Sequence, residues 1–228
     1  MSSFVRFTGI TTGGKTSCSL DFMFNFIKEK KDKRRGMFFK AEGRLSNNVK
    51  ERSGITFVSE AEEWTDGTCL VVDTNIYETI FTLIRNLIIN NPTETKYFFI
   101  MDSMDMMLRK CDIDRPLEDA NLVAGGALIT STFLKKVNLA LNKRGHIAVF
   151  ISQVRDEIKI NQYQVTLPRQ GRASGGHAIE HAPNTVLDFC PRHNEESIRE
   201  NSNDKNSKLI GHWCKVKILK DDSEKALT

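Results

Sequence analysis

Apolar stretches of two lengths alternate along the chain. Short runs rich in aromatic and β-branched residues are separated by longer segments in which apolar residues recur every three or four positions. The short runs predict strands and the longer segments predict helices, an alternation typical of a parallel sheet covered by helices. The predicted strands are residues 4–7, 37–40, 69–72, 97–101, 146–151, 185–189 and 213–219; the predicted helices are residues 17–30, 76–89 and 122–141. We therefore expect one α/β domain over residues 1–228, with a mostly parallel central sheet flanked by helices and a C-terminal antiparallel hairpin.

Three polar segments interrupt this pattern. Residues 156–176 replace periodicity with polar residues, glycines and Pro168, so we expect a long loop, and long loops in compact domains often carry function. Residues 195–208 are rich in Asn, Ser, Glu and Lys and predict a solvated, mobile hairpin loop between the last two strands. Residues 28–35 are strongly basic and are interpreted as a solvated helix end and turn.

The composition is that of a soluble globular protein. The chain has 228 residues, of which 39% are hydrophobic and 27% charged, and this length suits one α/β domain with a sizeable core. The sequence has neither a transmembrane run nor a secretory signal, and its five scattered cysteines indicate free thiols in a reducing compartment. We therefore expect a cytoplasmic protein of a bacterium or a virus-infected cell, without a membrane partner. The formal net charge of +4 permits a polyanion partner but does not require one.

Residues 9–16, with the sequence GITTGGKT, fit the phosphate-binding pattern G-x-x-x-x-G-K-[ST]. A predicted strand precedes this segment and a predicted helix follows it, so backbone N–H groups and the positive end of the helix dipole would face the phosphates. Lys15 would contact the β- and γ-phosphates, and the Thr16 hydroxyl would coordinate Mg²⁺. The residues expected to bind nucleotide are Gly9, Ile10, Thr11, Thr12, Gly13, Gly14, Lys15, Thr16 and Ser17. The sequence therefore predicts a nucleoside triphosphate site.

Three further polar residues follow predicted strands, where ligands bind in open α/β sheets. Asp102 follows the apolar run 97–101 and is a candidate magnesium ligand, with an ordinary strand-ending aspartate as the alternative. Glu42 follows the strand 37–40 and could polarise an attacking water, although taken alone it fits a surface residue better. Gln153 follows the strand 146–151, and its amide could contact the γ-phosphate. Taken alone, this assignment of Gln153 is weakly supported.

Taken in order, these segments resemble the RecA family of DNA recombinases. The matching segments are residues 9–16, 39–42, 100–103, 150–155, 175–179 and 215–220. The resemblance runs from about residue 4 to about residue 222, and only the phosphate loop is specific by itself. It implies a RecA-like P-loop fold and a DNA-dependent ATP hydrolase of recombination or repair. ATP and Mg²⁺ are the implied cofactors and single-stranded DNA is the implied partner.

The resemblance also implies a role for each matching position. Lys15 corresponds to the phosphate lysine, Thr16 to the magnesium hydroxyl, Asp102 to the Walker-B aspartate, and Glu42 to the glutamate that activates water. Gln153 corresponds to the glutamine that links the γ-phosphate to a DNA-binding loop at about residues 154–175. The residues of that loop expected to reach DNA phosphates are Arg155, Lys159, Arg169 and Arg172, and Lys220 is the candidate for contacting a neighbouring subunit's nucleotide.

Other parts of the family pattern have no counterpart. Too few residues precede Phe4 for the N-terminal helix and strand that join neighbouring recombinase subunits, and none follow Thr228 for the C-terminal domain of bacterial members. The resemblance implies a homo-oligomeric filament or ring, whose assembly would have to proceed without the N-terminal module. A first DNA loop would fall near residues 114–126, where Arg115 is the single basic residue.

Three alternatives stay open. Residues 178–181, followed by an apolar strand, also resemble DnaB-type replicative helicases, which place an arginine finger near their last strand. The nearby candidates here are Arg192, Lys215, Lys217 and Lys220, and lysines at the strand end favour the recombinase. A regulator that binds ATP and a recombinase without turnover is a second alternative. Zinc binding is the third, with Cys190, His193, His212 and Cys214 as possible ligands. Coincidence is the simpler interpretation of that set, because both cysteines also suit buried strand positions.

Overall fold

Strands and helices alternate in the computed structural model, which describes residues 3–43, 45–91, 93–116, 125–154, 176–191 and 197–222, with the backbone alone for residues 176–178. The strands are β1 (Phe4–Gly9), β2 (Arg34–Phe39), β3 (Thr56–Val58), β4 (Thr68–Val72), β5 (Lys96–Met101), β6 (Ile147–Ile151), β7 (Thr185–Phe189), β8 (Ser197–Arg199), β9 (Leu209–His212) and β10 (Val216–Asp221). The α-helices are α1 (Lys15–Ile27), α2 (Asn47–Ser53), α3 (Tyr77–Ile89), α4 (Gly125–Lys143) and α5 (Gly176–His181). Three short 3-10 helices, η1 (Ala61–Glu63), η2 (Met104–Met106) and η3 (Lys110–Asp112), complete the described elements.

Eight strands form one sheet in the order β10-β7-β1-β6-β5-β2-β4-β3. All neighbouring strands are parallel except β10, which pairs antiparallel with β7 at the edge of the sheet. Strands β8 and β9 form a separate antiparallel hairpin. The predicted α/β fold, with a mostly parallel sheet flanked by helices, is therefore confirmed.

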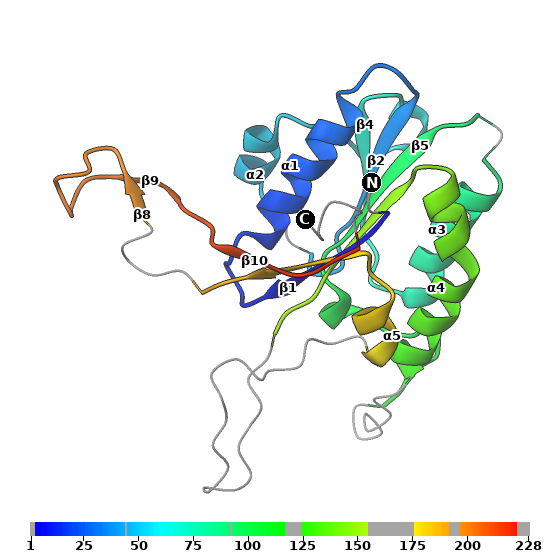
Figure 1. Ribbon diagram of the computed structural model, residues 1–228. Helices are drawn as coiled ribbons and strands as arrows, with labels where there is room; N and C mark the ends of the chain where they lie inside the picture. Colours follow the sequence, from blue (N-terminus) through cyan, green and yellow to red (C-terminus); the bar gives the residue numbers. More distant parts are fainter. Residues whose placement is uncertain are drawn as a thin grey trace, which may run out of the picture.

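Helices cover both faces of the sheet, with α1 and α2 on one face and α3, α4 and α5 on the other (Figure 1). Strand β5 shows why a continuous apolar run is needed in the middle of such a sheet. Tyr97, Phe99 and Met101 belong to the core beneath α3 and α4, whereas Phe98 and Ile100 belong to the core beneath α1. Because successive side chains of a strand point to opposite faces, a central parallel strand must be apolar at every position.

Aromatic side chains contribute much of the core beneath α3 and α4. The rings of Phe81 on α3 and Phe133 on α4 stack with centroids 4.1 Å apart, and Phe150 on β6 meets Phe4 on β1 edge-on at 4.6 Å. Such pairs contribute about 0.5–1.5 kcal/mol each beyond the burial of their area. This packing fixes α3 and α4 against the central strands β1 and β6.

The structure differs from the sequence prediction at short or polar elements. Helix α2 and strand β3 were not predicted: no residue of α2 is buried, so it has no apolar face to detect. Strand β8 lies within residues 195–208, which were predicted to form a loop. The strand predicted at residues 213–219 begins at Val216 instead, because pairing with β7 begins where Val216 meets Phe189; Trp213 is 70% exposed and lies outside the sheet. Within the described residues, no helix combines the length and apolarity needed to cross a membrane.

Candidate functional site

Four neighbouring parallel strands bring the predicted site residues to one edge of the sheet. Strand β1 leads into the loop before α1, and Gln153, Asp102 and Glu42 follow the carboxyl ends of β6, β5 and β2. Because β6 lies between β1 and β5, Gln153 stands next to the loop and in line with both carboxylates. A cleft of about 220 Å³ is lined by Thr11, Thr12, Gly13, Gly14, Lys15, Thr16, Ser17, Glu42, Asp102 and Gln153. The structure therefore brings together the residues that the sequence predicted to share a site.

The loop between β1 and α1 requires glycine at two positions. Gly9 has φ 133°, and a Cβ atom there would collide with the backbone oxygen of Phe189 on β7. Gly14, the N-cap residue directly before α1, is left-handed with φ 97° and provides no side-chain cap. The first N–H groups of a helix have no partner within the helix, so without a cap they can bind an anion. The start of α1 is thus suited to a phosphate group.

Lys15 is buried at the base of this loop. Its Nζ donates hydrogen bonds to the backbone oxygens of Gly9 at 2.9 Å and Ile10 at 2.6 Å. Burial lowers the pKa of the ammonium, because the charged form loses water, and the nearby carboxylates of Asp102 and Glu42 oppose this effect. A cation that is short of water and held by two carbonyl groups is prepared to exchange these partners for phosphate oxygens.

Thr16 and Asp102 form the candidate metal site. The Thr16 hydroxyl donates a hydrogen bond of 2.6 Å to Oδ2 of Asp102. Burial raises the pKa of Asp102 to about 6; the hydrogen bond from Thr16 opposes this shift and the charge of Glu42 adds to it. A hydroxyl and a carboxylate are the hard oxygen ligands that Mg²⁺ prefers, and a cation would offset the cost of a buried carboxylate. The residues present therefore fit a magnesium ion.

Glu42 is held by two neighbours. Its Oε1 accepts hydrogen bonds of 2.6 Å from Ser103 Oγ and from Gln153 Nε2. The backbone N–H of Glu42 donates to the backbone oxygen of Asp102 at 3.0 Å. Oε2 has no hydrogen-bond partner among the residues that the structure describes. One carboxylate oxygen thus fixes the orientation of Glu42, and the other is available for chemistry in the cleft.

Two contacts of this site were not predicted from the sequence. Ser103 orients Glu42, and the carboxylate of Asp105 accepts a hydrogen bond of 2.7 Å from the backbone N–H of Gln153. Both residues lie in the short segment after β5 that also contains Asp102. Polar residues just beyond a buried strand are the signal that could have identified them, because ligands gather at that edge of the sheet.

Other predicted residues lie away from the cleft or outside the described chain. Lys220 on β10 donates to the backbone oxygens of His181 and Pro183, at 3.1 and 2.8 Å, and pairs with Asp222 at 3.2 Å. Arg115 pairs with Asp112 at 3.1 Å. The predicted DNA-binding residues Arg155, Lys159, Arg169 and Arg172, and the alternative Arg192, lie outside the described residues.

The zinc alternative gains no support from the described part of the chain. His193 lies outside it, Cys190 is buried, and Cys214 is exposed. No group of three or more His, Cys, Asp or Glu side chains able to hold a metal ion occurs among the residues that the structure describes. The candidate magnesium site is not such a group, because its two protein ligands would be the Thr16 hydroxyl and the Asp102 carboxylate.

Neither a scan against protein-family models nor a search of curated protein sequences found a match to this chain. We therefore infer function from the contacts of the site itself. These contacts join residues of one loop and of the ends of three other strands, which is where an open α/β sheet binds its ligand.

Proposed function

We propose that this chain is an ATP-dependent, DNA-binding ATPase of RecA type that acts in DNA recombination or repair. The observation that carries the proposal is the meeting of Thr16, Glu42, Asp102 and Gln153 in one cleft at the mouth of the loop before α1. A triphosphate hydrolase needs a phosphate cradle, a carboxylate beside the metal, a group that orients water and a group that responds to the γ-phosphate. Each requirement has a residue of suitable chemistry in this cleft.

Thr16 and Asp102 are the residues that would hold Mg²⁺. Magnesium, when bound, supplies positive charge that stabilises the negative charge developing on the phosphate oxygens during transfer. Asp102 must be ionised to act as a ligand, and burial makes that ionisation costly. Lys15 would bind the β- and γ-phosphates with the ammonium that now contacts the Gly9 and Ile10 oxygens.

Glu42 is the proposed general base. Oε1 is occupied by hydrogen bonds from Ser103 and Gln153, which leaves Oε2 to accept the proton of the attacking water. Ser103 is therefore a positioning residue, because it acts on the reaction through Glu42. General bases of this kind contribute about 10²- to 10⁴-fold to the rate.

Gln153 connects the reaction to the segment proposed to bind DNA. Its side-chain amide contacts Glu42, and the next residue, Val154, donates its backbone N–H to the Gly9 oxygen at 3.1 Å. The same Gly9 oxygen accepts a hydrogen bond from Lys15. A triphosphate that draws Lys15 away would therefore remove one of the two donors from the Gly9 oxygen and leave it to Val154, the residue that begins the 154–175 segment. ATP binding would favour DNA binding by that segment, and hydrolysis would release it.

ATP turnover with and without single-stranded DNA tests this proposal. We expect hydrolysis to rise when DNA is added, and Glu42→Gln to retain ATP binding while losing about 10²-fold or more in turnover. Lys15→Ala should abolish ATP binding, detected as loss of the rise in melting temperature that saturating ATP and Mg²⁺ give to the wild type. Equal stabilisation of Lys15→Ala and wild type by ATP would refute the phosphate-loop assignment.

The same assays separate the alternatives. Duplex unwinding with a fixed polarity would identify a helicase core instead of a recombinase. ATP binding without turnover, at every DNA concentration, would identify a regulator. Turnover that is indifferent to DNA would leave an ATPase and remove the DNA part of the proposal.

A further inference from the structure

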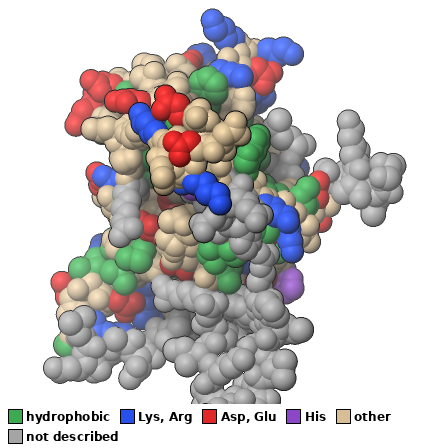
Figure 2. Space-filling model, turned by 90° about the vertical axis from the view of Figure 1, so that its left-hand side faces the viewer, with side chains coloured by type: hydrophobic (Ala, Val, Ile, Leu, Met, Phe, Trp, Pro, Cys, Tyr) green, Lys and Arg blue, Asp and Glu red, His purple; other side chains and the backbone are tan. Residues whose placement is uncertain are grey.

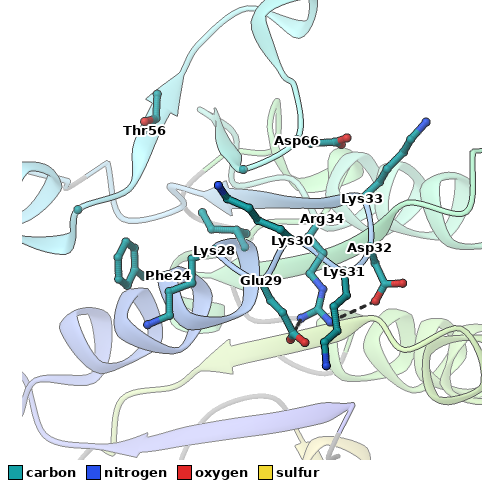
Figure 3. A pocket seen from close by; sticks show the side chains of 13 residues that line it. Phe24, Lys28, Glu29, Lys30, Lys31, Asp32, Lys33, Arg34, Thr56 and Asp66 are labelled. Carbon is teal, nitrogen blue, oxygen red and sulfur yellow. Dashed lines mark hydrogen bonds and ion pairs between the residues drawn. The ribbon is translucent and has the colours of Figure 1, made fainter.

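A second cleft, of about 570 Å³, lies at the opposite edge of the sheet from the site above. It is bounded by the end of α1, the turn that follows, and the starts of β2 and β3 (Figure 3). Strands β1 and β2 run in the same direction, so the turn before Arg34 lies at the amino edge of the sheet, whereas Glu42 lies at the carboxyl edge. We call it the basic cleft, because Lys28, Lys30, Lys31, Lys33 and Arg34 line it.

The acidic side chains of the basic cleft are already paired. Glu29 pairs with Arg34 at 2.8 Å, Asp32 with Arg34 at 3.3 Å and Lys96 at 2.7 Å, and Asp66 with Arg35 at 3.1 Å. In contrast, the four lysines of the cleft form no ion pair with any residue that the structure describes. The cleft therefore carries four lysine charges that have no ion-pair partner in the described part of the chain.

The negative end of the α1 dipole can stabilise Lys28, the C-cap residue of the helix, but not the three lysines farther along the turn. The dipole acts mainly within the last turn of a helix, and the last turn of α1 contains no basic residue. Lys28 follows the helix directly, and its ammonium lies over the ring of Phe24 at 5.1 Å. Lys30, Lys31 and Lys33 lie farther along the turn and are exposed. Their mutual repulsion is a cost that an anionic ligand would remove.

Arg34 fixes the turn that carries these lysines. Its guanidinium is buried, donates to the Phe26 oxygen at 3.2 Å and lies over the Phe26 ring at 4.7 Å. The lysine side chains extend from this anchored turn in different directions (Figure 3). Lys and Arg side chains gather at the top of the molecule in Figure 2. The turn between α1 and β2 lies at the top of Figure 1, and the two views differ only by a rotation about the vertical axis. The charge is thus spread over a surface and does not converge on one point.

An extended polyanion fits this arrangement better than a small phosphate compound or a protein partner does. A small phosphate compound is normally held by convergent donors at a helix N-terminus, whereas this cleft contains the carboxyl end of α1 and divergent lysines. A protein partner would need an apolar centre to its interface, but Phe24 and Ile27 of this cleft are at least partly buried. We propose that the basic cleft binds the sugar-phosphate backbone of a nucleic acid, without selecting a base sequence. This site is independent of ATP and of the proposed nucleotide cleft.

The test replaces Lys30, Lys31 and Lys33 by glutamine together. A matched control replaces Lys135, Lys136 and Lys143 by glutamine, because these exposed lysines lie on α4, on the other face of the sheet, and give the same change in charge. Binding of a short fluorescein-labelled DNA duplex is measured by anisotropy, without nucleotide or Mg²⁺, from about 50 to 200 mM salt. The segment 155–175 is unchanged in all three proteins, so any difference between the variants arises from the lysines replaced.

We expect the cleft variant to bind duplex about tenfold or more weakly than the control at the lowest salt. The slope of log affinity against log salt should become shallower by about 0.9 for each lysine in contact with a phosphate. Equal affinity and slope in the cleft and control variants would overturn the proposal. Competition by polyglutamate as effective as by unlabelled DNA would also overturn it, because the site would then accept an acidic protein.

Discussion

The stability of this protein should fall in acid through one buried histidine. His146, which directly precedes β6, is fully buried, and its Nδ1 accepts a hydrogen bond of 3.1 Å from the backbone N–H of Tyr97. Burial lowers the pKa of His146 from 6.5 to about 4, and the charges of Arg144 and Lys96 add to this shift. Protonation would place a hydrogen on Nδ1, directed at the Tyr97 N–H group that now donates to this atom. The folded state therefore favours the neutral ring.

The sign and size of the effect follow from proton linkage. A histidine whose pKa is lower in the folded state contributes full stability above the unfolded pKa of 6.5, and that stability is lost as the pH falls toward about 4. From these two values, acidification from about pH 8 to about pH 5 should lower the contribution of His146 to the free energy of unfolding by about 2 kcal/mol. Asp102 acts in the opposite direction, because its raised pKa of about 6 makes its contribution more favourable as the pH falls.

A comparison with His146→Asn separates these two effects. The asparagine oxygen can still accept from Tyr97, but it does not titrate in this range. Urea unfolding can be followed by Trp64 fluorescence, because Trp64 is buried and its ring centroid lies 5.5 Å from that of Tyr97. The difference in unfolding free energy between wild type and variant should shrink by about 2 kcal/mol between about pH 8 and about pH 5. A difference that stays constant with pH would refute this role of His146.

Three further predictions concern the candidate site. Gly9→Ala should lower the free energy of unfolding by about 2 kcal/mol or more, because the new Cβ would meet the Phe189 backbone. As a control, Gly43→Ala should lower it by only about 1 kcal/mol, because Gly43 has φ +70° but open space around it. Similar losses for the two variants in urea unfolding would contradict this prediction. Asp102→Asn should raise stability at about pH 8 by up to about 3 kcal/mol, since it removes a buried charge, yet lose the Mg²⁺-dependent stabilisation by ATP. A variant that ATP and Mg²⁺ still stabilise would exclude Asp102 as the metal ligand. Gln153→Ala should keep ATP binding but lose stimulation of turnover by DNA, because the link between Glu42 and the following segment is gone; undiminished stimulation would disprove that link.

Parts of the fold were predictable because their signal is local. The continuous apolar runs at residues 97–101 and 147–151 predicted buried central strands, and the structure has β5 and β6 there. The glycine-rich segment 9–16 predicted a strand, a turn and a helix in that order, which is what β1, the loop and α1 provide. Burial on both faces of a parallel sheet imposes such patterns on the sequence directly.

Helix α2 shows where local reasoning failed for lack of an apolar face. Its boundaries do carry signals, because the Ser46 hydroxyl accepts a hydrogen bond of 3.3 Å from the Val49 N–H, and Gly54 ends the helix in the left-handed conformation with φ 68°. Capping residues alone do not predict a helix without an apolar periodicity between them, and no residue of this helix is buried.

The sequence alone determined which residue types stand at the ends of the strands: the phosphate-loop pattern, Glu42, Asp102 and Gln153. Only the tertiary structure decided that β6 lies between β1 and β5, and this order brings Gln153 within 2.6 Å of Glu42 across 111 residues of chain. It also revealed that Ser103 orients Glu42 and that the lysines after α1 stand around a cleft. Hydrophobic periodicity records which side of an element is buried, whereas strand order and side-chain contacts depend on pairing between distant segments, which no local pattern encodes.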